Sequence, residues 1–218
     1  WDETLVSFKG ELPETVLERF LRPLAPVEVT NGNAVFDAPG PVIDATQPYK
    51  ATLETNKGDI VINFVTDAPK AVNSFAFLAS KGFYDGVAFY YIDHDYLAQA
   101  GDPNCRLNSQ TICTGFGDPG YTLPLEAGST KHEQWSVALP QVSQADTVHG
   151  SQFRIYFTPD ERLDGTETVF GKVVQGMDIL ENQPDLEICS ALSQASDTCV
   201  DEIPEDALII ENVRIEPA

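Results

Sequence analysis

The amino-acid sequence predicts a mainly β protein, a closed or nearly closed β-barrel with an extension at its N-terminus. From Tyr49 onward, the chain is a succession of short segments in which apolar and polar residues alternate, as in half-buried β-strands. Only two helices of any length are expected among them. That is too few for the repeated strand-helix units of a doubly wound sheet, so the barrel is the favoured class.

Residues 1–47 differ in texture from the rest and are expected to form a separate extension. Residues 13–24 contain a proline suited to a first helical turn and apolar side chains at helical spacing, which predicts one short amphipathic helix. The tract that follows, to about residue 47, is rich in proline and glycine. We expect an irregular, extended connector there, and a folded domain over residues 48–218.

The order of elements in the domain follows from its turn and stop signals. Residues 51–65 form two alternating runs broken by Asn56-Lys57-Gly58, a hairpin signal with glycine where a positive φ is needed. Residues 68–82 carry apolar side chains at helical spacing and end on Gly82, which predicts a helix. Further strands are expected at 87–92, 95–100, 135–139, 153–157 and 168–174, a short helical turn at 177–182, and a closing strand at 207–215.

The charge balance excludes some classes of partner. The chain has 13 basic and 34 acidic residues, a formal net charge of −21, so approach to nucleic acid or anionic lipid is opposed rather than steered. We favour a solvated acidic surface that keeps the protein soluble; attraction to a basic partner is the alternative. No stretch approaches the roughly 20 apolar residues of a membrane span. Because the chain begins at Trp1, we expect a processed precursor, with room for a removed signal or anchor upstream.

The four cysteines are Cys105, Cys113, Cys189 and Cys199. Four cysteines admit three pairings, and their grouping as two close pairs favours Cys105–Cys113 and Cys189–Cys199. Neither spacing is typical of a zinc knuckle, so no metal is expected. Two local disulfides indicate an oxidising, extracytoplasmic compartment such as a periplasm, a lumen or the cell surface. Four free thiols in a cytosolic protein are the alternative.

Two short motifs are expected to be structural. Residues 115–120 match G-x-G-x-x-G, but no helix can start at the Tyr-Thr-Leu-Pro that follows, so a turn-rich loop is predicted rather than a dinucleotide site. The Asp93-His94-Asp95 cluster has no serine or cysteine nucleophile in an activating context. It is predicted to be a polar connection between two strands.

Six segments, in order along the chain, resemble the cyclophilins, a family of peptidyl-prolyl isomerases. They are TNKGDIVI (55–62), APKAVNSFAFLASKGFYDG (68–86), AQAGDPN (98–104), GFGDPGYTLPLE (115–126), HGSQFRIYF (149–157) and LDGTETVFGKVVQGMDIL (163–180). The resemblance spans about residues 48–217. It implies a closed eight-stranded antiparallel β-barrel capped by two α-helices, with a peptide groove on one face. Segments 105–113 and 140–148 depart from the compact family pattern as insertions.

The resemblance also implies a set of site residues, several of which depart from the family pattern. Tyr91 stands where the family has the catalytic arginine of F-H-R-V-I, and Gln99 matches the family's glutamine. Residues expected to contact the peptide are Tyr96, Leu97, Gln152, Arg154, Arg162 and Leu163. Among these, Arg154 replaces a phenylalanine of the proline pocket, Arg162 replaces a frequent tryptophan, and nearby Glu167 replaces a histidine.

Two functional hypotheses follow from these substitutions. We favour a degenerate site retained for binding peptide or protein, in an accessory subunit of an extracytoplasmic or membrane-attached assembly. The alternative is a weakly active isomerase that assists protein folding and acts on proline-containing segments. Rotation about an X–Pro bond requires no nucleophile, so neither hypothesis needs a cofactor.

Overall fold

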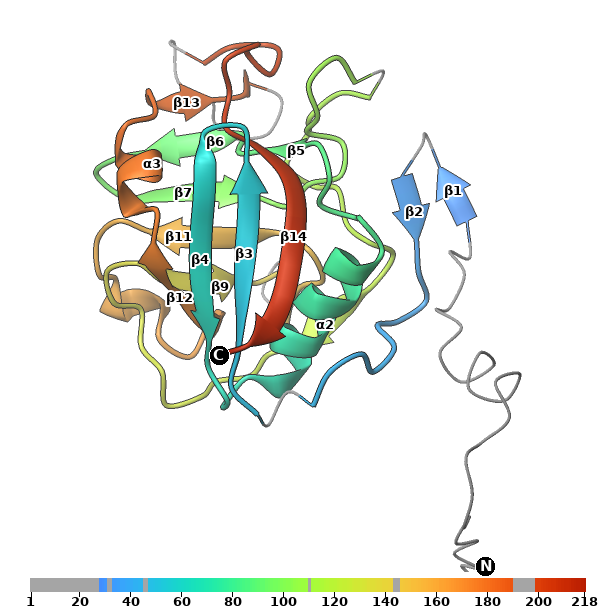
Figure 1. Cartoon of the computed structure of the whole chain (residues 1–218), viewed down its shortest axis with the longest axis vertical. Helices are drawn as coiled ribbons and strands as arrows, with labels where there is room; N and C mark the ends of the chain where they lie inside the picture. The colour runs from blue at the N-terminus through green and yellow to red at the C-terminus, as the bar shows by residue number, and fades with distance from the viewer. Residues whose placement is uncertain (1–27, 31–32, 45–46, 110, 143–145, 190–198) are drawn as a thin grey trace, which may run out of the picture.

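The protein is described by a computed structural model that covers residues 28–30, 33–44, 47–109, 111–142, 146–189 and 199–218 (Figure 1). The short helix expected within residues 13–24 lies outside these residues. The part of the extension that is described begins with a hairpin of β1 (Glu28–Thr30) and β2 (Asn33–Val35).

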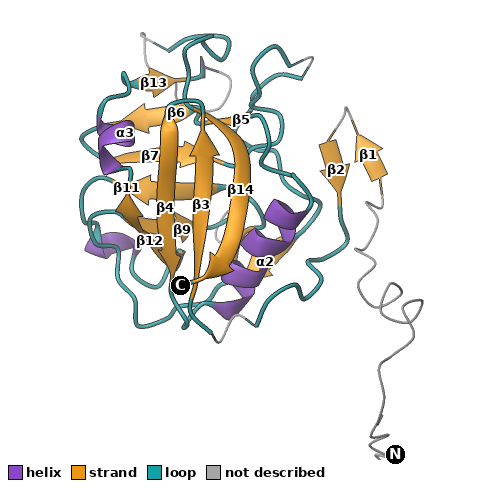
Figure 2. Ribbon diagram, viewed as in Figure 1, coloured by secondary structure: helices purple, strands orange, loops and turns teal. Residues whose placement is uncertain are grey.

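In the described part of the chain, ten strands form one curled antiparallel sheet (Figure 2). They are β3 (Tyr49–Thr55), β4 (Gly58–Phe64), β5 (Val87–Ala88), β6 (Tyr91–Asp93), β7 (Leu97–Ala100), β9 (Ser136–Leu139), β11 (Phe153–Tyr156), β12 (Thr168–Gln175), β13 (Leu186–Glu187) and β14 (Ile209–Pro217). The strand order is β13-β6-β7-β11-β9-β12-β4-β3-β14-β5. The mainly β, antiparallel class is confirmed. The sheet is a half-barrel with β13 and β5 at its ends, and closure of the barrel stays a prediction.

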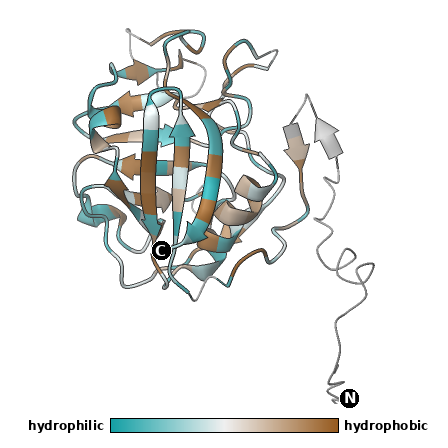
Figure 3. Ribbon diagram, viewed as in Figure 1, coloured by the Kyte–Doolittle hydropathy of each residue, from teal (hydrophilic) through white to brown (hydrophobic). Residues whose placement is uncertain are grey.

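The expected hairpin and the expected closing strand are both present. β3 and β4 pair from Lys50 with Asn63 to Thr55 with Gly58, whose φ of 126° suits glycine alone. β14 pairs with β3 along its length. Polar and apolar positions alternate along β14 in Figure 3, which places one face of the strand on the core.

The strand predicted at 87–92 is wrong as a single element. It divides into β5, which pairs with β14, and β6, which pairs with β7 and β13. Between them the Phe89 N–H donates to the Leu208 carbonyl and the Tyr90 N–H to the Gln99 carbonyl. Phe89 and Tyr90 therefore connect β5, at one end of the strand order, with β6, near the other end. The alternation of polar and apolar side chains does not indicate this break in the strand.

Two α-helices lie in the described residues, α2 (Pro69–Ser80) and α3 (Met177–Glu181), as expected for the class. The longer, α2, begins at a proline, ends just before Gly82 at a φ of 64°, and packs against β12 and β14. Its Phe75 contacts the rings of Phe64, Tyr84, Phe153 and Phe170 at the centre of the core. None of the described helices has both the length and the apolar character needed to cross a bilayer.

The connector after β2 packs on the domain. Phe36 is 2% exposed, and its ring meets the edge of Phe77 on α2 at 5.1 Å between centroids. Its N–H donates to the Pro119 carbonyl. Farther along, the Asn73 side chain on α2 accepts from the Val42 N–H and donates to the Gly40 carbonyl. Residues 36–44 are irregular, as expected, whereas the hairpin of β1 and β2 in the same connector corrects the prediction of an irregular tract there. The domain boundary at residues 47–48 stays a prediction.

The two short motifs lie in the loop and the turn where the sequence predicted them. Residues 115–120 lie in a loop before β8 (Thr122–Pro124), a short strand that pairs with β10 (Thr147–His149) and that the sequence pattern did not indicate. Asp93-His94-Asp95 lies at the turn between β6 and β7.

Candidate active site

One row of side chains crosses five adjacent strands of the sheet. Tyr91 on β6 is paired with Gln99 on β7, and Gln99 is paired in turn with Arg154 on β11. Arg154 is then paired with Ala138 on β9, and Ala138 with Val169 on β12. Because directly paired residues point to the same face of a sheet, these side chains share one surface. Three predicted site residues are therefore neighbours by strand register.

An apolar group lies on this surface, which we call the site cluster. Its buried members are Leu97, Ala138, Tyr156 and Val169, and half-buried Tyr91, Tyr96 and Leu163 pack against them. Three residues expected to contact peptide, Tyr96, Leu97 and Leu163, therefore meet Tyr91 in one place. Their half-buried edges offer an apolar surface beside the polar side chains described next.

The polar half of the site is a set of bonded side chains, which we call the charged network. Its members are Gln99, Gln152, Arg154, Glu167, Tyr156 and His132. The Arg154 Nε donates to Gln99 Oε1 at 3.0 Å, and Gln99 Nε2 donates to Gln152 Oε1 at 3.0 Å. The same Gln152 oxygen accepts from the Tyr90 hydroxyl at 2.6 Å. Gln99 and Gln152 are both buried, so their amides are held in fixed orientations.

Glu167 is the anionic centre of this network. Its side chain is 3% exposed, and Oε1 accepts from Arg154 Nη1 at 2.6 Å while Oε2 accepts from the Tyr156 hydroxyl at 2.6 Å. The Nε2 atom of buried His132 lies 3.6 Å from Oε2. Burial alone would raise the pKa of Glu167, but His132, Arg154 and Tyr156 together hold it below its ordinary value. The residue is therefore a carboxylate that holds the guanidinium of Arg154 in place.

His132 links the network to the chain before β12. Its Nδ1 atom lies 3.1 Å from Asp164 Oδ1, and its ring meets the edge of the Tyr156 ring. Burial alone would lower the pKa of His132, but the carboxylates of Glu167 and Asp164 raise it above its ordinary value. The imidazolium form is thus favoured between two carboxylates.

Tyr91, at the position of the family's arginine, directs its hydroxyl away from the network. The hydroxyl donates to Asp93 Oδ2 on the same strand at 3.3 Å. Burial, with the nearby charge of Asp93, raises the pKa of Tyr91 to about 12. The side chain is therefore a neutral phenol whose proton already has an acceptor.

Arg162 is the one predicted peptide-binding residue that lies apart from both groups. Its side chain is 85% exposed, and Nε and Nη2 donate to the two oxygens of Asp160 at 2.8 Å each. Asp160 also accepts from the Tyr96 hydroxyl at 3.2 Å, which helps to fix that ring at the edge of the site cluster. Arg162 is therefore connected to the site cluster through Asp160 and Tyr96.

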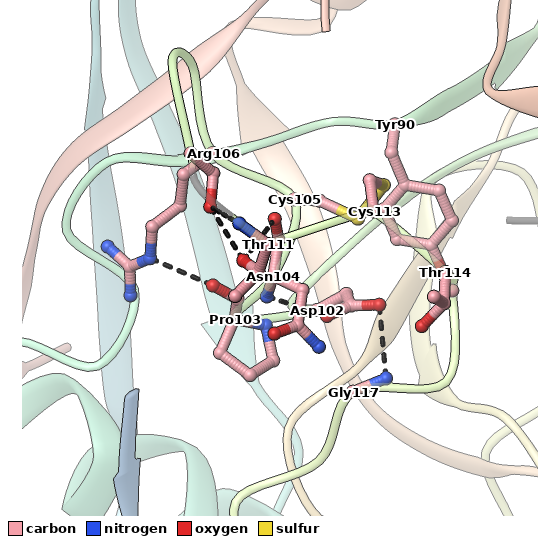
Figure 4. Close-up of a disulfide and its surroundings, with 12 residues drawn as sticks. Tyr90, Asp102, Pro103, Asn104, Cys105, Arg106, Thr111, Cys113, Thr114 and Gly117 are labelled. Atoms are coloured by element: carbon pink, nitrogen blue, oxygen red, sulfur yellow. Dashed lines mark hydrogen bonds between the residues drawn. A yellow bond between two sulfur atoms is a disulfide. The ribbon is translucent and has the colours of Figure 1, made fainter. Parts of the chain in front are cut away.

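The loop that follows the Cys105–Cys113 disulfide, at residues 115–117, supports the other side of Gln152. The structure contains two disulfides, Cys105–Cys113 and Cys189–Cys199, the pairs that the spacing favours. Figure 4 shows Asp102 beside the first of them, where it accepts from the Gly117 N–H at 3.0 Å. Gln152 Nε2 donates to the carbonyls of Gly115 and Gly117 at 2.8 Å each. The loop is thereby tied to the charged network.

Sequence reasoning missed four side chains of this face: Tyr90, His132, Tyr156 and Asp160. Tyr156 had a signal, because it follows Arg154 by two residues on an expected strand and must share its face. The others come from turns or from the break between β5 and β6, where no periodic pattern places a side chain.

Comparison with known proteins shows the family. The sequence pattern of the cyclophilin type peptidyl-prolyl cis-trans isomerase/CLD family matches residues 50–214. A peptidyl-prolyl cis-trans isomerase of Helicobacter pylori is 38% identical over 136 residues, which cover 60% of this chain and 77% of that protein. Peptidyl-prolyl cis-trans isomerase B of Bacillus subtilis is 36% identical over 115 residues, which cover 53% of this chain and 75% of that protein.

Solved structures agree with the fold. A cyclophilin type peptidyl-prolyl cis-trans isomerase of Cryptosporidium parvum superposes with a TM-score of 0.62 at 24% identity, covering 78% of this chain and 99% of that one. The same isomerase solved in the presence of the dipeptide Ala-Pro gives a TM-score of 0.61 at 25% identity, with the same coverage. Strand order, family pattern and relatives thus agree that this chain belongs to the family of cyclophilin type peptidyl-prolyl cis-trans isomerases.

Proposed function

We propose that this chain binds proline-containing segments at the site cluster and isomerises their X–Pro bonds slowly. The observation that carries the proposal is the meeting of a half-buried apolar surface with a guanidinium and two amides held by buried partners. An apolar surface of this kind suits a proline ring, and the relative solved with Ala-Pro supports this class of ligand. The arrangement combines binding of the ring with donors for the adjoining amide.

The chemistry needs no covalent step. The barrier to rotation about a peptide bond, about 18–20 kcal/mol, arises because the nitrogen lone pair is shared with the carbonyl group. In the twisted state that lone pair localises on nitrogen and can accept a hydrogen bond. A site therefore accelerates rotation by gripping the ring and by donating to the twisted state more strongly than to the planar one.

Slow turnover follows from Tyr91. A neutral phenol donates one hydrogen bond, whereas a guanidinium donates several with charge, and charge-assisted bonds are roughly twice as strong. Tyr91 also already donates to Asp93. Loss of a charged donor at this position costs about 2–4 kcal/mol at the transition state, or roughly 30- to 1000-fold in rate.

A direct assay of the unmodified chain tests the proposal. Exchange between the cis and trans forms of an Ala-Pro peptide, followed by NMR, is expected to be accelerated by the chain. The expected kcat/KM is roughly 30- to 1000-fold below that of isomerase B of Bacillus subtilis under the same conditions. Equal turnover by the two proteins would refute the slow site, and uncatalysed exchange at equimolar protein would refute the isomerase activity.

The proposed place of action is outside the cytoplasm. Its support is the pair of disulfides, Cys105–Cys113 and Cys189–Cys199, because such bonds persist in oxidising compartments and are rare in the cytosol.

A second role, as an accessory subunit of an extracytoplasmic or membrane-attached assembly, is favoured by exposed apolar side chains. Ile112 is 71% exposed within the Cys105–Cys113 loop, and Phe116 is 67% exposed between the two glycines whose carbonyls Gln152 binds. Exposed aromatic and aliphatic side chains next to a peptide-binding face are typical of protein interfaces.

This second role predicts co-migration with a larger complex. In gel filtration of a gently solubilised native extract, the chain is expected to elute in a defined complex. Ile112→Ser with Phe116→Ser is expected to shift it to the monomer position. Val174→Ser, at an exposed apolar position on β12, is the matched control and is expected to leave the complex intact. Recovery of the unmodified chain only as a free monomer would refute the role.

A further inference from the structure

The charge missing from β6 is present two strands away, on the same row of side chains. Arg154 and Tyr91 are both paired with Gln99, one from β11 and the other from β6. Neighbouring strands lie about 4.8 Å apart, so the two Cα atoms are roughly 10 Å apart, within reach of two long side chains that meet over the strand between them. The Arg154 Nε atom is bonded to the side chain of Gln99 itself. The Nε of the guanidinium therefore faces β7, the strand that carries the register partner of Tyr91.

The guanidinium is held by its partners and keeps donor capacity. Nε donates to Gln99 and Nη1 to Glu167, and neither of these bonds uses Nη2. The Arg154 side chain is 29% exposed, whereas its partner Glu167 is 3% exposed. Since Glu167 is fixed in turn by Tyr156, the plane of the guanidinium is set from the buried side. The guanidinium lies next to the site cluster, because Glu167 bonds both Arg154 and the hydroxyl of Tyr156, a member of that cluster.

Arg162, the other arginine expected to contact peptide, lacks these properties. Its side chain is 85% exposed, and both ends of its fork are engaged by Asp160. The geometry therefore distinguishes between the two arginines.

Resting on the proposed isomerase function, we propose that Arg154 is the catalytic donor of this chain, a charged donor on β11 that replaces only in part the one that β6 lacks. As the X–Pro bond rotates, the proline nitrogen becomes pyramidal and accepts a hydrogen bond from Nη2. The bond weakens again when the amide regains planarity, and no proton is transferred and no covalent bond breaks. Glu167 and Gln99 position the guanidinium for this step.

The test pairs a variant of Arg154 with a neutralised Glu167, so that no unpaired carboxylate is left in the interior. Arg154→Met with Glu167→Gln is expected to lower kcat/KM for the Ala-Pro peptide by about 30-fold or more. Glu167→Gln alone is expected to lose less, because the charged donor remains. The matched control is Arg214→Met. It breaks the ion pair between Arg214 on β14 and Glu54 on β3 and is expected to leave kcat/KM unchanged. Circular dichroism checks that each variant is folded.

The outcomes separate this proposal from the one on which it rests. Absence of catalysis by the unmodified chain refutes both. Catalysis that survives Arg154→Met with Glu167→Gln, but is lost in Tyr91→Phe, refutes the role of Arg154 and leaves the isomerase function standing.

A measurement on the unmodified chain keeps the test decisive if the double variant does not fold. With ¹⁵N-labelled arginine, the Nη resonances of Arg154 are expected to shift on titration with the Ala-Pro peptide, while those of Arg214 stay in place. Unchanged Arg154 resonances at saturating peptide would refute the proposal.

Discussion

Replacement of the buried carboxylate by alanine, Glu167→Ala, is expected to lower the free energy of unfolding by about 3 kcal/mol or more. Three groups lose their shared partner: the guanidinium of Arg154, the hydroxyl of Tyr156 and the ring of His132. Arg154 can turn toward water, but His132 is 1% exposed in its side chain and cannot. The Tyr156 hydroxyl is then left unsatisfied in the interior, and buried His132 keeps Asp164 alone of its two carboxylates; both changes cost free energy.

Urea unfolding measures this effect, with the midpoint expected to fall and the slope to stay constant. The matched control is Glu133→Ala, which removes a carboxylate that also lies 2.6 Å from its basic partner, Lys172. These side chains are 66% and 48% exposed, so the expected loss is below about 1 kcal/mol. Equal losses in the two variants would show that the charged network contributes no more to stability than a surface pair.

The second large effect is a gain of isomerase activity. Restoring the family residues at three positions of the row and network, in the variant Tyr91→Arg with Arg154→Phe and Glu167→His, is expected to raise kcat/KM by roughly 30- to 1000-fold. The new guanidinium on β6 again lies beside Gln99, its register partner. The phenylalanine restores an apolar wall of the proline pocket at position 154. In the unmodified chain Arg154 occupies this position and donates from Nε to Gln99 and from Nη1 to Glu167. The change at Glu167 avoids a buried carboxylate that has lost its guanidinium partner.

The single variant Tyr91→Arg serves as its control. In this variant the new guanidinium at position 91 lies near that of Arg154, which Gln99 already binds. Repulsion between the two like charges is expected to limit the gain in kcat/KM. The same cis–trans exchange assay compares the variants. A triple variant that is folded but less than about 3-fold faster would show that the peptide-binding face has changed at positions other than these three.

Local pattern was enough to predict most of the fold. The hairpin of β3 and β4, helix α2 and the closing strand β14 were all indicated by signals that lie within each element: alternation, a proline at the start, or a glycine that accepts a positive φ. The division of residues 87–92 into β5 and β6 was not indicated. It depends on carbonyls of residues 99 and 208, and no short window of sequence contains that information.

The candidate site, too, was predictable from the sequence only in part. The sequence by itself determined the identity of each residue along the family motifs, and thereby predicted departures from the family pattern at Tyr91, Arg154 and Glu167. Only the tertiary structure decided that Arg154 pairs with Glu167 and reaches Gln99, while Arg162 is engaged by Asp160. The physical reason is that strand register and burial, not sequence separation, determine which charges meet and how strongly they interact.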